Sequence, residues 1–121
     1  MSVHHFLTMS SLIEKEATAN VDRSKISSVF YNRLKESMPL QTDPTVLYAL
    51  GKHKSRTMYE DLKVDSPYNT YKNKGLPPGP ISNSGETSME ATLHPEKTEY
   101  LYFLANTKTG QVYFSKTFRR A

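Results

Sequence analysis

The stretch Phe6–Ala17, FLTMSSLIEKEA, decides the fold because it combines a helical apolar stripe with two acidic residues, Glu14 and Glu16. Its apolar positions recur at steps of three and four residues: Phe6, Met9, Ile13 and Ala17. This period places them on one face of an α-helix. The helix is predicted over residues 2–17, with Ser2 as its N-cap, since a serine hydroxyl can accept from an unpaired amide of the first turn.

The two glutamates of this helix cannot serve the same cleft. At about 100° per residue, Glu14 and Glu16 lie about 200° apart around the helix axis. One can be functional while the other is a surface or structural charge, and the helical wheel does not choose between them. Glu14 shares its side with Ser10 and Ala17, so it could occupy a partly apolar site. Such a site raises the pKa of a carboxyl, as a general acid requires.

Further helices are predicted from caps, prolines and hydrophobic period. Asn20 is expected to cap a second amphipathic helix that runs to about Ser37 and is stopped by Pro39. The short link between the first two helices predicts an αα pair that packs face to face. Shorter helices are expected at residues 45–50, 58–63 and 86–93.

The C-terminal part reads as a β-hairpin. Residues 100–105 are aromatic and aliphatic, residues 106–110 form the predicted turn, and residues 111–115 form the returning strand. A lone hairpin is not stable in water, so it must pack on the helices. Helices followed by a hairpin predict the α+β class.

The bulk composition is that of one soluble domain. The chain has 121 residues, with 36% hydrophobic and 23% charged, and no cysteine. Disulfides and thiolate metal sites are therefore excluded. The net charge is +4, from 16 basic and 12 acidic residues. The basic residues are spread out, which indicates a solvated surface or attraction to an anionic polymer such as a cell wall, and not nucleic-acid binding.

Two loops carry candidate binding residues. In LQTDPT at 40–45, Gln41 could bind a sugar hydroxyl, whereas Asp43 could simply cap the helix that follows. In YNTY, Tyr68 and Tyr71 could stack on pyranose rings, and Asn69 could bond to hydroxyl or acetamido groups. A packed structural loop is the alternative for YNTY. The loop from 64 to 85 is rich in proline and glycine, and its length predicts an ordered functional segment.

Several chemistries are set aside by missing patterns. The sequence has no HExxH pattern, and His53 and His94 stand alone, so no metal site is predicted. It contains no GxSxG, Ser-x-x-Lys or phosphate-binding glycine loop. We therefore expect an activity that uses no cofactor.

Four segments, taken in order, resemble a known family: LIEKE, LQTDPTVLYALG, SPYNTYKNKGLPPGPISNSG and YLYFLAN. They resemble the catalytic domain of the YceG-like (MltG) endolytic peptidoglycan transglycosylases, from about Met9 to Thr117. The resemblance implies a fold like that of lysozyme and the soluble lytic transglycosylases. It implies that Glu14 is the catalytic acid and that the glycan is bound by Gln41, Asp43, Tyr68, Asn69 and Tyr71. The sequence departs from the family pattern at Ser84 and Val112.

The resemblance also implies a wider context. The family has a membrane anchor and a LysM-like region that this sequence does not contain, so residues 1–121 are expected to be one catalytic domain of a longer, membrane-anchored protein. That protein is expected to act on the extracytoplasmic face of the bacterial membrane. Its implied partners are peptidoglycan glycan strands and, further, proteins of cell-wall synthesis.

The implied reaction cleaves the bond between N-acetylmuramic acid and N-acetylglucosamine within a strand. Glu14 is expected to protonate the leaving oxygen and then to deprotonate the muramyl primary hydroxyl, which closes an anhydro ring. Two alternatives stay open. One is a muramidase-type hydrolase in which Asp43 holds a water or stabilises the oxocarbenium ion. The other is a non-catalytic peptidoglycan-binding module.

Overall fold

The structure, a computed structural model, describes residues 1–17, 22–51, 57–105 and 108–117. These residues form an α+β fold of helices and one antiparallel hairpin. The elements in chain order are the helices α1 (Val3–Glu16), α2 (Arg23–Lys35) and α3 (Asp43–Leu50), the 3₁₀ helix η1 (Tyr59–Lys63), the helix α4 (Glu86–Leu93), and the strands β1 (Tyr102–Ala105) and β2 (Val112–Ser115).

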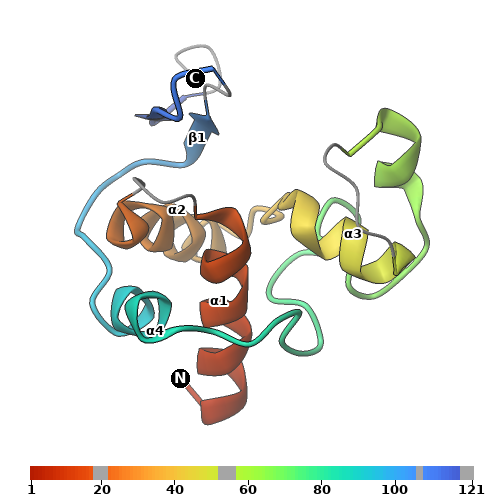
Figure 1. Cartoon of the computed structure of the whole chain (residues 1–121), viewed down its shortest axis with the longest axis horizontal. Coiled ribbons are helices and arrows are strands. Elements are labelled where there is room, and N and C mark those ends of the chain that lie inside the picture. The colour runs from red at the N-terminus through yellow and green to blue at the C-terminus, as the bar shows by residue number, and fades with distance from the viewer. Residues whose placement is uncertain (18–21, 52–56, 106–107, 118–121) are drawn as a thin grey trace.

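Helix α1 runs through the middle of the molecule, with α2 and α4 on one side of it and α3 on the other (Figure 1). The Ser2 hydroxyl accepts a hydrogen bond from the backbone N–H of His5 at 3.1 Å, so the predicted N-cap is confirmed. Met9, Leu12 and Ile13 are fully buried. The buried stripe is therefore centred on the second half of the helix, just before the two glutamates.

Helix α2 packs on α1 as the sequence predicts. Its Ile26 and Phe30 join Met9 of α1 in one hydrophobic cluster. The cap differs from the prediction, because the Asp22 carboxylate accepts from the N–H of Lys25 at 3.2 Å. The predicted cap, Asn20, lies outside the described residues.

The shorter helices lie close to their predicted positions. Helix α3 begins at Asp43 and ends at Gly51, whose φ of 68° is the left-handed conformation that glycine adopts at little cost. Helix α4 has the predicted bounds. The segment predicted as a helix over 58–63 is a 3₁₀ turn.

The long loop between η1 and α4 is folded onto the helices. Its buried residues include Asn69, Thr70 and Ile81. The backbone N–H of Ile81 donates to the hydroxyl of Ser11 in α1 at 3.0 Å. Burial of backbone groups requires partners, and α1 supplies one here. The prediction of an ordered loop is confirmed.

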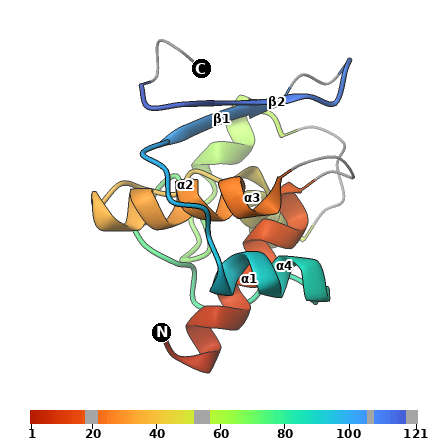
Figure 2. The ribbon, with the colours of Figure 1, turned by 90° about the vertical axis from the view of Figure 1, so that its left-hand side faces the viewer.

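The C-terminal hairpin lies above α2 (Figure 2). In the antiparallel ladder, Tyr102 pairs with Ser115 and Leu104 pairs with Tyr113. Phe103 packs edge-to-face on Phe30 of α2, with ring centroids 6.1 Å apart. The helices thus support the hairpin as expected. Residues 106–107 of the predicted turn lie outside the described residues.

Arg33 of α2 joins three parts of the fold. Its side chain is buried, and its Nε donates to the carbonyl of Leu101 at 2.7 Å. Its NH1 group donates to the carbonyls of Pro39 and Leu40, each at 3.0 Å. Burying a guanidinium is costly unless its donors are paired, and these carbonyls pair them. Arg33 therefore fixes the segment after α2 relative to the start of the hairpin.

Among the described helices, none has the length and apolar character that crossing a membrane requires.

Truncation of the α1 core should destabilise the chain strongly. Leu12 is fully buried, so Leu12→Ala is expected to lower the free energy of unfolding by about 2–5 kcal/mol. Leu7 on the same helix is 38% exposed, and Leu7→Ala serves as the matched control with an expected loss of about 1 kcal/mol or less. Urea denaturation followed by circular dichroism measures both. Equal losses for the two variants would contradict this arrangement of α1.

Candidate active site

Glu14 is bound to the start of helix α4. Its Oε1 accepts from the backbone N–H of Gly85 at 3.0 Å and from the hydroxyl of Ser88 at 2.8 Å. Gly85 is the N-cap residue of α4 and has no side chain with which to cap the helix. Glu14 therefore supplies from α1 the capping oxygen that α4 lacks.

These contacts hold the Glu14 carboxyl in its ionised form. The N–H of Gly85 is the largest cause that lowers the pKa of Glu14, followed by the hydroxyl of Ser88, with Arg23 and Lys15 adding weaker attraction. Partial burial opposes them but is outweighed. A carboxylate that accepts two hydrogen bonds at a helix N-terminus is stabilised by both the bonds and the helix dipole.

Glu16 has the opposite environment. It is the last residue of α1, is half-buried, and has a pKa raised to about 7, first by burial and second by the negative charge of Asp43. The C-terminal end of a helix carries partial negative charge, which also disfavours a carboxylate. Near neutral pH, Glu16 holds its proton for a large fraction of the time and can both donate and accept one.

Asp43 and Tyr71 complete the cluster around Glu16. Asp43 is the first residue of α3, and the hydroxyl of Tyr71 donates a short hydrogen bond to its Oδ1. Burial raises the pKa of Tyr71 most, and the bond to Asp43, the charge of Asp43 and the charge of Glu16 raise it further. The charge of Arg33 acts in the other direction on Tyr71. Tyr71 therefore stays protonated and remains a hydrogen-bond donor.

Asn69 holds the backbone of this tyrosine. It is fully buried, and its amide nitrogen donates to the carbonyls of Leu62 at 2.9 Å and Val64 at 2.8 Å. Its Oδ1 accepts from the backbone N–H of Tyr71 at 2.9 Å. The side chain thus has three protein partners, and the sugar contact that the sequence predicts at Asn69 stays a prediction.

Tyr68 and Gln41 lie at different levels of exposure. The Tyr68 ring is half-buried, contacts the Tyr48 ring at a tilt of 47° with centroids 4.8 Å apart, and packs against the hydrophobic core. Gln41 is exposed, and its φ of 50° is a left-handed conformation that is uncommon for a residue with a side chain. Its backbone N–H donates to the carbonyl of Thr70 at 3.3 Å. The side chain is thus accessible two residues before Asp43, and the sugar contact predicted at Gln41 stays a prediction.

The sequence left Glu14 and Glu16 as alternatives for the functional carboxyl and gave no role in the site to Arg33. The position of Glu16 was itself a signal in the sequence. A carboxylate in the last turn of a helix interacts unfavourably with the helix dipole, so it is uncommon there without a functional or structural role. No comparable signal marked Arg33, whose role depends on carbonyls from distant segments. Of the residues predicted from sequence, the structure brings Asp43 and Tyr71 together and sends Glu14 elsewhere.

A sequence profile described as the YceG-like family matches residues 1–120. The chain belongs to the YceG-like family. A crystal structure of a YceG-like protein from Listeria monocytogenes superposes on it with a TM-score of 0.98 and 78% identity, covering 99% of this chain and 39% of that one.

Curated YceG-like relatives carry the name endolytic murein transglycosylase. The one from Bacillus subtilis is 68% identical over 119 residues, which cover 98% of this chain and 33% of the relative. One from Streptococcus pneumoniae is 42% identical over 120 residues, which cover 95% of this chain and 22% of the relative. The chain thus spans a third or less of the length of these relatives.

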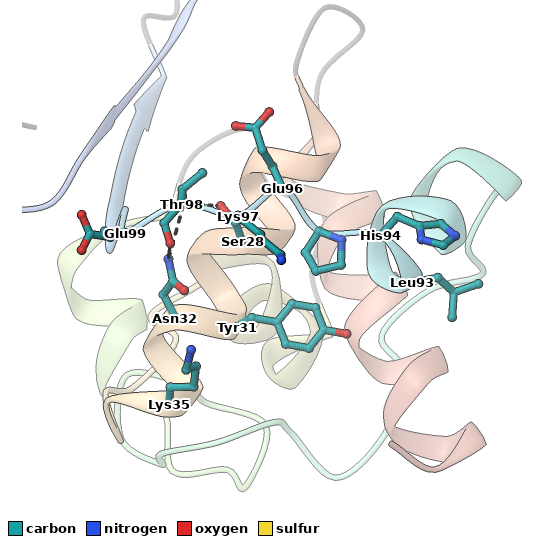
Figure 3. Close-up of a pocket in the computed structure, with 11 residues that line it drawn as sticks. Ser28, Tyr31, Asn32, Lys35, Leu93, His94, Glu96, Lys97, Thr98 and Glu99 are labelled. Atoms are coloured by element: carbon teal, nitrogen blue, oxygen red, sulfur yellow. Dashed lines mark hydrogen bonds between the residues drawn. The ribbon is translucent and has the colours of Figure 1, made fainter.

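A separate groove of this YceG-like chain does not contain the acidic cluster. It has a volume of about 860 Å³ and is lined by residues of α2 and of the segment from Leu93 to Glu99 (Figure 3). Asn32 on its wall donates to the carbonyls of Thr98 and Tyr100, at 3.0 and 2.9 Å. Ser28 also bonds to the hydroxyl of Thr98 at 2.8 Å. These contacts fasten the segment to α2, so the groove's central polar groups are already paired.

The described residues contain no group of three histidine, aspartate or glutamate side chains placed to hold a metal ion.

The two glutamates should have opposite effects on stability. Loss of the charged cap in Glu14→Gln is expected to lower the free energy of unfolding by about 1 kcal/mol at pH 7. The pKa of Glu14 is lowered on folding, so this stabilisation is present above the unfolded pKa and is lost as the pH falls through the folded pKa. Urea denaturation at pH 7 and pH 3 measures the difference, which should be smaller at pH 3 than at pH 7.

Glu16→Gln is the matched comparison. Since the pKa of Glu16 is raised from 4.5 to about 7, the folded chain keeps a proton that the unfolded chain releases, and stability falls as the pH rises across that window. Glu16→Gln removes this penalty and should be more stable than the parent chain at pH 8 but not at pH 4. A variant that is less stable than the parent at pH 8 would contradict the raised pKa.

Proposed function

We propose that this chain is the catalytic part of an endolytic peptidoglycan transglycosylase whose general acid is one of the two glutamates of α1, with Glu16 as the first candidate and Glu14, the residue that the sequence indicates, as the alternative. The printed name of the Bacillus subtilis and Streptococcus pneumoniae relatives supports the activity. The observation that carries the choice of residue is the contrast in environment. Glu16 has a pKa raised to about 7 beside Asp43 and Tyr71, whereas Glu14 is ionised and bound to α4. The role that the sequence predicts for Glu14 stays the alternative, which the variants below test.

The reaction follows from a single carboxyl that titrates near neutral pH. Glu16 in its protonated form donates its proton to the oxygen of the bond between N-acetylmuramic acid and N-acetylglucosamine, and the bond from that oxygen to the muramyl anomeric carbon breaks. The Glu16 carboxylate then takes the proton of the muramyl primary hydroxyl, whose oxygen bonds to the same anomeric carbon. The product ends in an anhydro ring, and Glu16 is protonated again. No water enters the products.

Asp43 and Tyr71 set the state of this acid. The negative charge of Asp43 helps to keep the proton on Glu16 and also lies where it can attract a developing oxocarbenium ion. Tyr71 holds the Asp43 carboxylate by its short hydrogen bond. Gln41, exposed and two residues before Asp43, is proposed to bind the glycan through its amide.

The proposal extends to the type of fold, the cellular location and the protein partners. A glutamate at the end of a core helix, with a loop aspartate and a hairpin beyond it, supports a lysozyme-like arrangement. Peptidoglycan as substrate supports an extracytoplasmic location for the longer protein of which this chain represents a part, and cell-wall synthesis proteins as partners.

The two glutamates provide a direct test. Glu16→Gln is expected to reduce release of anhydromuramyl products from purified sacculi by about 100-fold or more, because a general acid contributes at least that factor. Glu14→Gln, a change of the same chemistry two residues away, is expected to retain most of the activity at a temperature where both variants are folded. Chromatography with mass spectrometry measures the products. Retained activity in Glu16→Gln together with loss in Glu14→Gln would restore the original assignment.

Asp43→Asn should change the pH dependence of the reaction. Its negative charge raises the pKa of Glu16, so its removal lowers that pKa and moves the alkaline limb of the rate profile to lower pH. This variant keeps both Tyr71 and Arg33, so only the charge at position 43 changes. Asp65→Asn, a change at an exposed aspartate elsewhere, is the control and should leave the profile in place. An alkaline limb that stays at the parent's pH in Asp43→Asn would contradict the role given to Asp43.

Mass spectrometry also decides between the remaining readings. Hydrolysis with Asp43 holding a water gives reducing ends, whereas transglycosylation gives anhydro ends. A non-catalytic wall-binding module would give neither product, and its binding to peptidoglycan would survive changes at both Glu14 and Glu16.

A further inference from the structure

The C-terminal hairpin has two faces, and one of them packs on the helices. Directly paired residues of an antiparallel ladder project to the same face, and neighbours along a strand project to opposite faces. Phe103 and Phe114 are paired, and both pack against the hydrophobic core. The opposite face therefore carries Tyr102 and Leu104 from β1 and Tyr113 from β2.

This second face carries two exposed large side chains. Leu104 is 54% exposed and Tyr113 is 47% exposed, and the two are direct cross-strand partners. Their neighbours on the same face, Tyr102 and Ser115, are less exposed. The face is thus buried at the end near α2 and open at the far end. A paired leucine and tyrosine form a contiguous apolar surface, which a scattered single residue would not.

The buried end of this face leads to the acidic cluster. The Arg33 guanidinium lies over the Tyr102 ring, 5.1 Å from its centroid. The same guanidinium donates to the carbonyl of Leu40, the residue before Gln41. Its charge also acts on Tyr71, which holds Asp43. The buried end of the face is therefore linked, through Tyr102 and the buried Arg33, to the segment that precedes Gln41 and Asp43.

The chemistry of the open end suits a sugar ring. Tyrosine and leucine side chains can cover the C–H face of a pyranose, and the phenol can bond at its edge. The Tyr113 hydroxyl donates to Oε1 of Gln111 at 3.1 Å. The Gln111 amide N–H groups and the lone pairs of the phenol oxygen are then directed by this bond and can bind sugar hydroxyls. The surface offers apolar contact and hydrogen bonding together, which a lipid tail or an apolar helix would not need.

We propose that Leu104 and Tyr113 form a stacking platform for a sugar ring of the glycan strand, outside the bond that is cleaved. This inference rests on the proposed function and extends it, because a platform away from the acid favours long strands over short fragments. An enzyme that cuts within strands must hold glycan on both sides of the bond. The platform supplies such a contact on the hairpin side.

Kinetics on glycans of two lengths test the platform. Tyr113→Ala is expected to raise KM for long glycan strands freed of peptides about five- to tenfold and to leave kcat within about twofold. The same change should leave KM unaltered for a substrate too short to reach the hairpin. Tyr113→Trp should retain the parent KM, because it keeps a stacking ring. Leu93→Ala, at another exposed apolar residue, is the control and should have no effect. Unchanged KM on long strands in Tyr113→Ala overturns the platform.

Direct binding separates this inference from the proposed function. Intact glycan strands are titrated against Glu16→Gln with and without Tyr113→Ala, and the dissociation constant should rise about five- to tenfold in the double variant. If the parent chain releases no product but the double variant binds more weakly, the platform stands and the catalytic proposal fails. If the parent is active and binding is unchanged, the platform fails alone. If neither chain binds strands, the platform fails as well.

Sedimentation velocity tests whether a second copy of the chain, and not a glycan, binds to this surface. A second copy of the chain seated on Leu104 and Tyr113 would make the parent a dimer and Tyr113→Ala a monomer. That result, with unchanged glycan binding, would overturn the platform in favour of a self-association surface. The expected result is the same sedimentation coefficient for both chains.

Discussion

The helical geometry of α1 separates two carboxyl groups that stand two residues apart in the sequence. The turn of about 200° between them sends Glu14 to the start of α4 and Glu16 toward α3. One accepts hydrogen bonds at a helix N-terminus, which lower its pKa, and the other lies at the end of its own helix, where burial and Asp43 raise its pKa. The separation therefore gives two neighbouring carboxyl groups opposite pKa shifts.

Arg33 gives the site its second constraint. A buried guanidinium needs partners for its donors, and here they are carbonyls from both sides of the molecule. Satisfying them draws the segment that precedes Asp43 toward the strand that begins at Tyr102. The hydrogen bonds that satisfy Arg33 and stabilise the fold therefore also hold the start of the hairpin near the segment that leads to Asp43. Replacing Arg33 would disturb the fold and the site together. Its role is therefore best inferred from variants of neighbouring residues.

The YNTY segment shows how a motif divides between support and chemistry. Asn69 is fully buried and uses its side chain to tie η1 to the loop, and Tyr68 packs on the core. Only Tyr71 reaches the acidic cluster, where it bonds to Asp43. A sequence reader sees four polar or aromatic residues that all suit a sugar. Burial decides which are available, because a side chain whose groups are all paired inside the protein cannot also bind a ligand.

The sequence by itself determined the α+β class, the positions of the helices within a few residues, the hairpin and the family, because periodicity, caps and turn residues are local properties. It also determined that the two glutamate side chains must point to different sides of their helix. Only the tertiary structure decided how the environments of the two carboxyl groups differ. A pKa depends on burial and on charges brought near in space, and Gly85, Ser88 and Asp43 come from segments far along the chain.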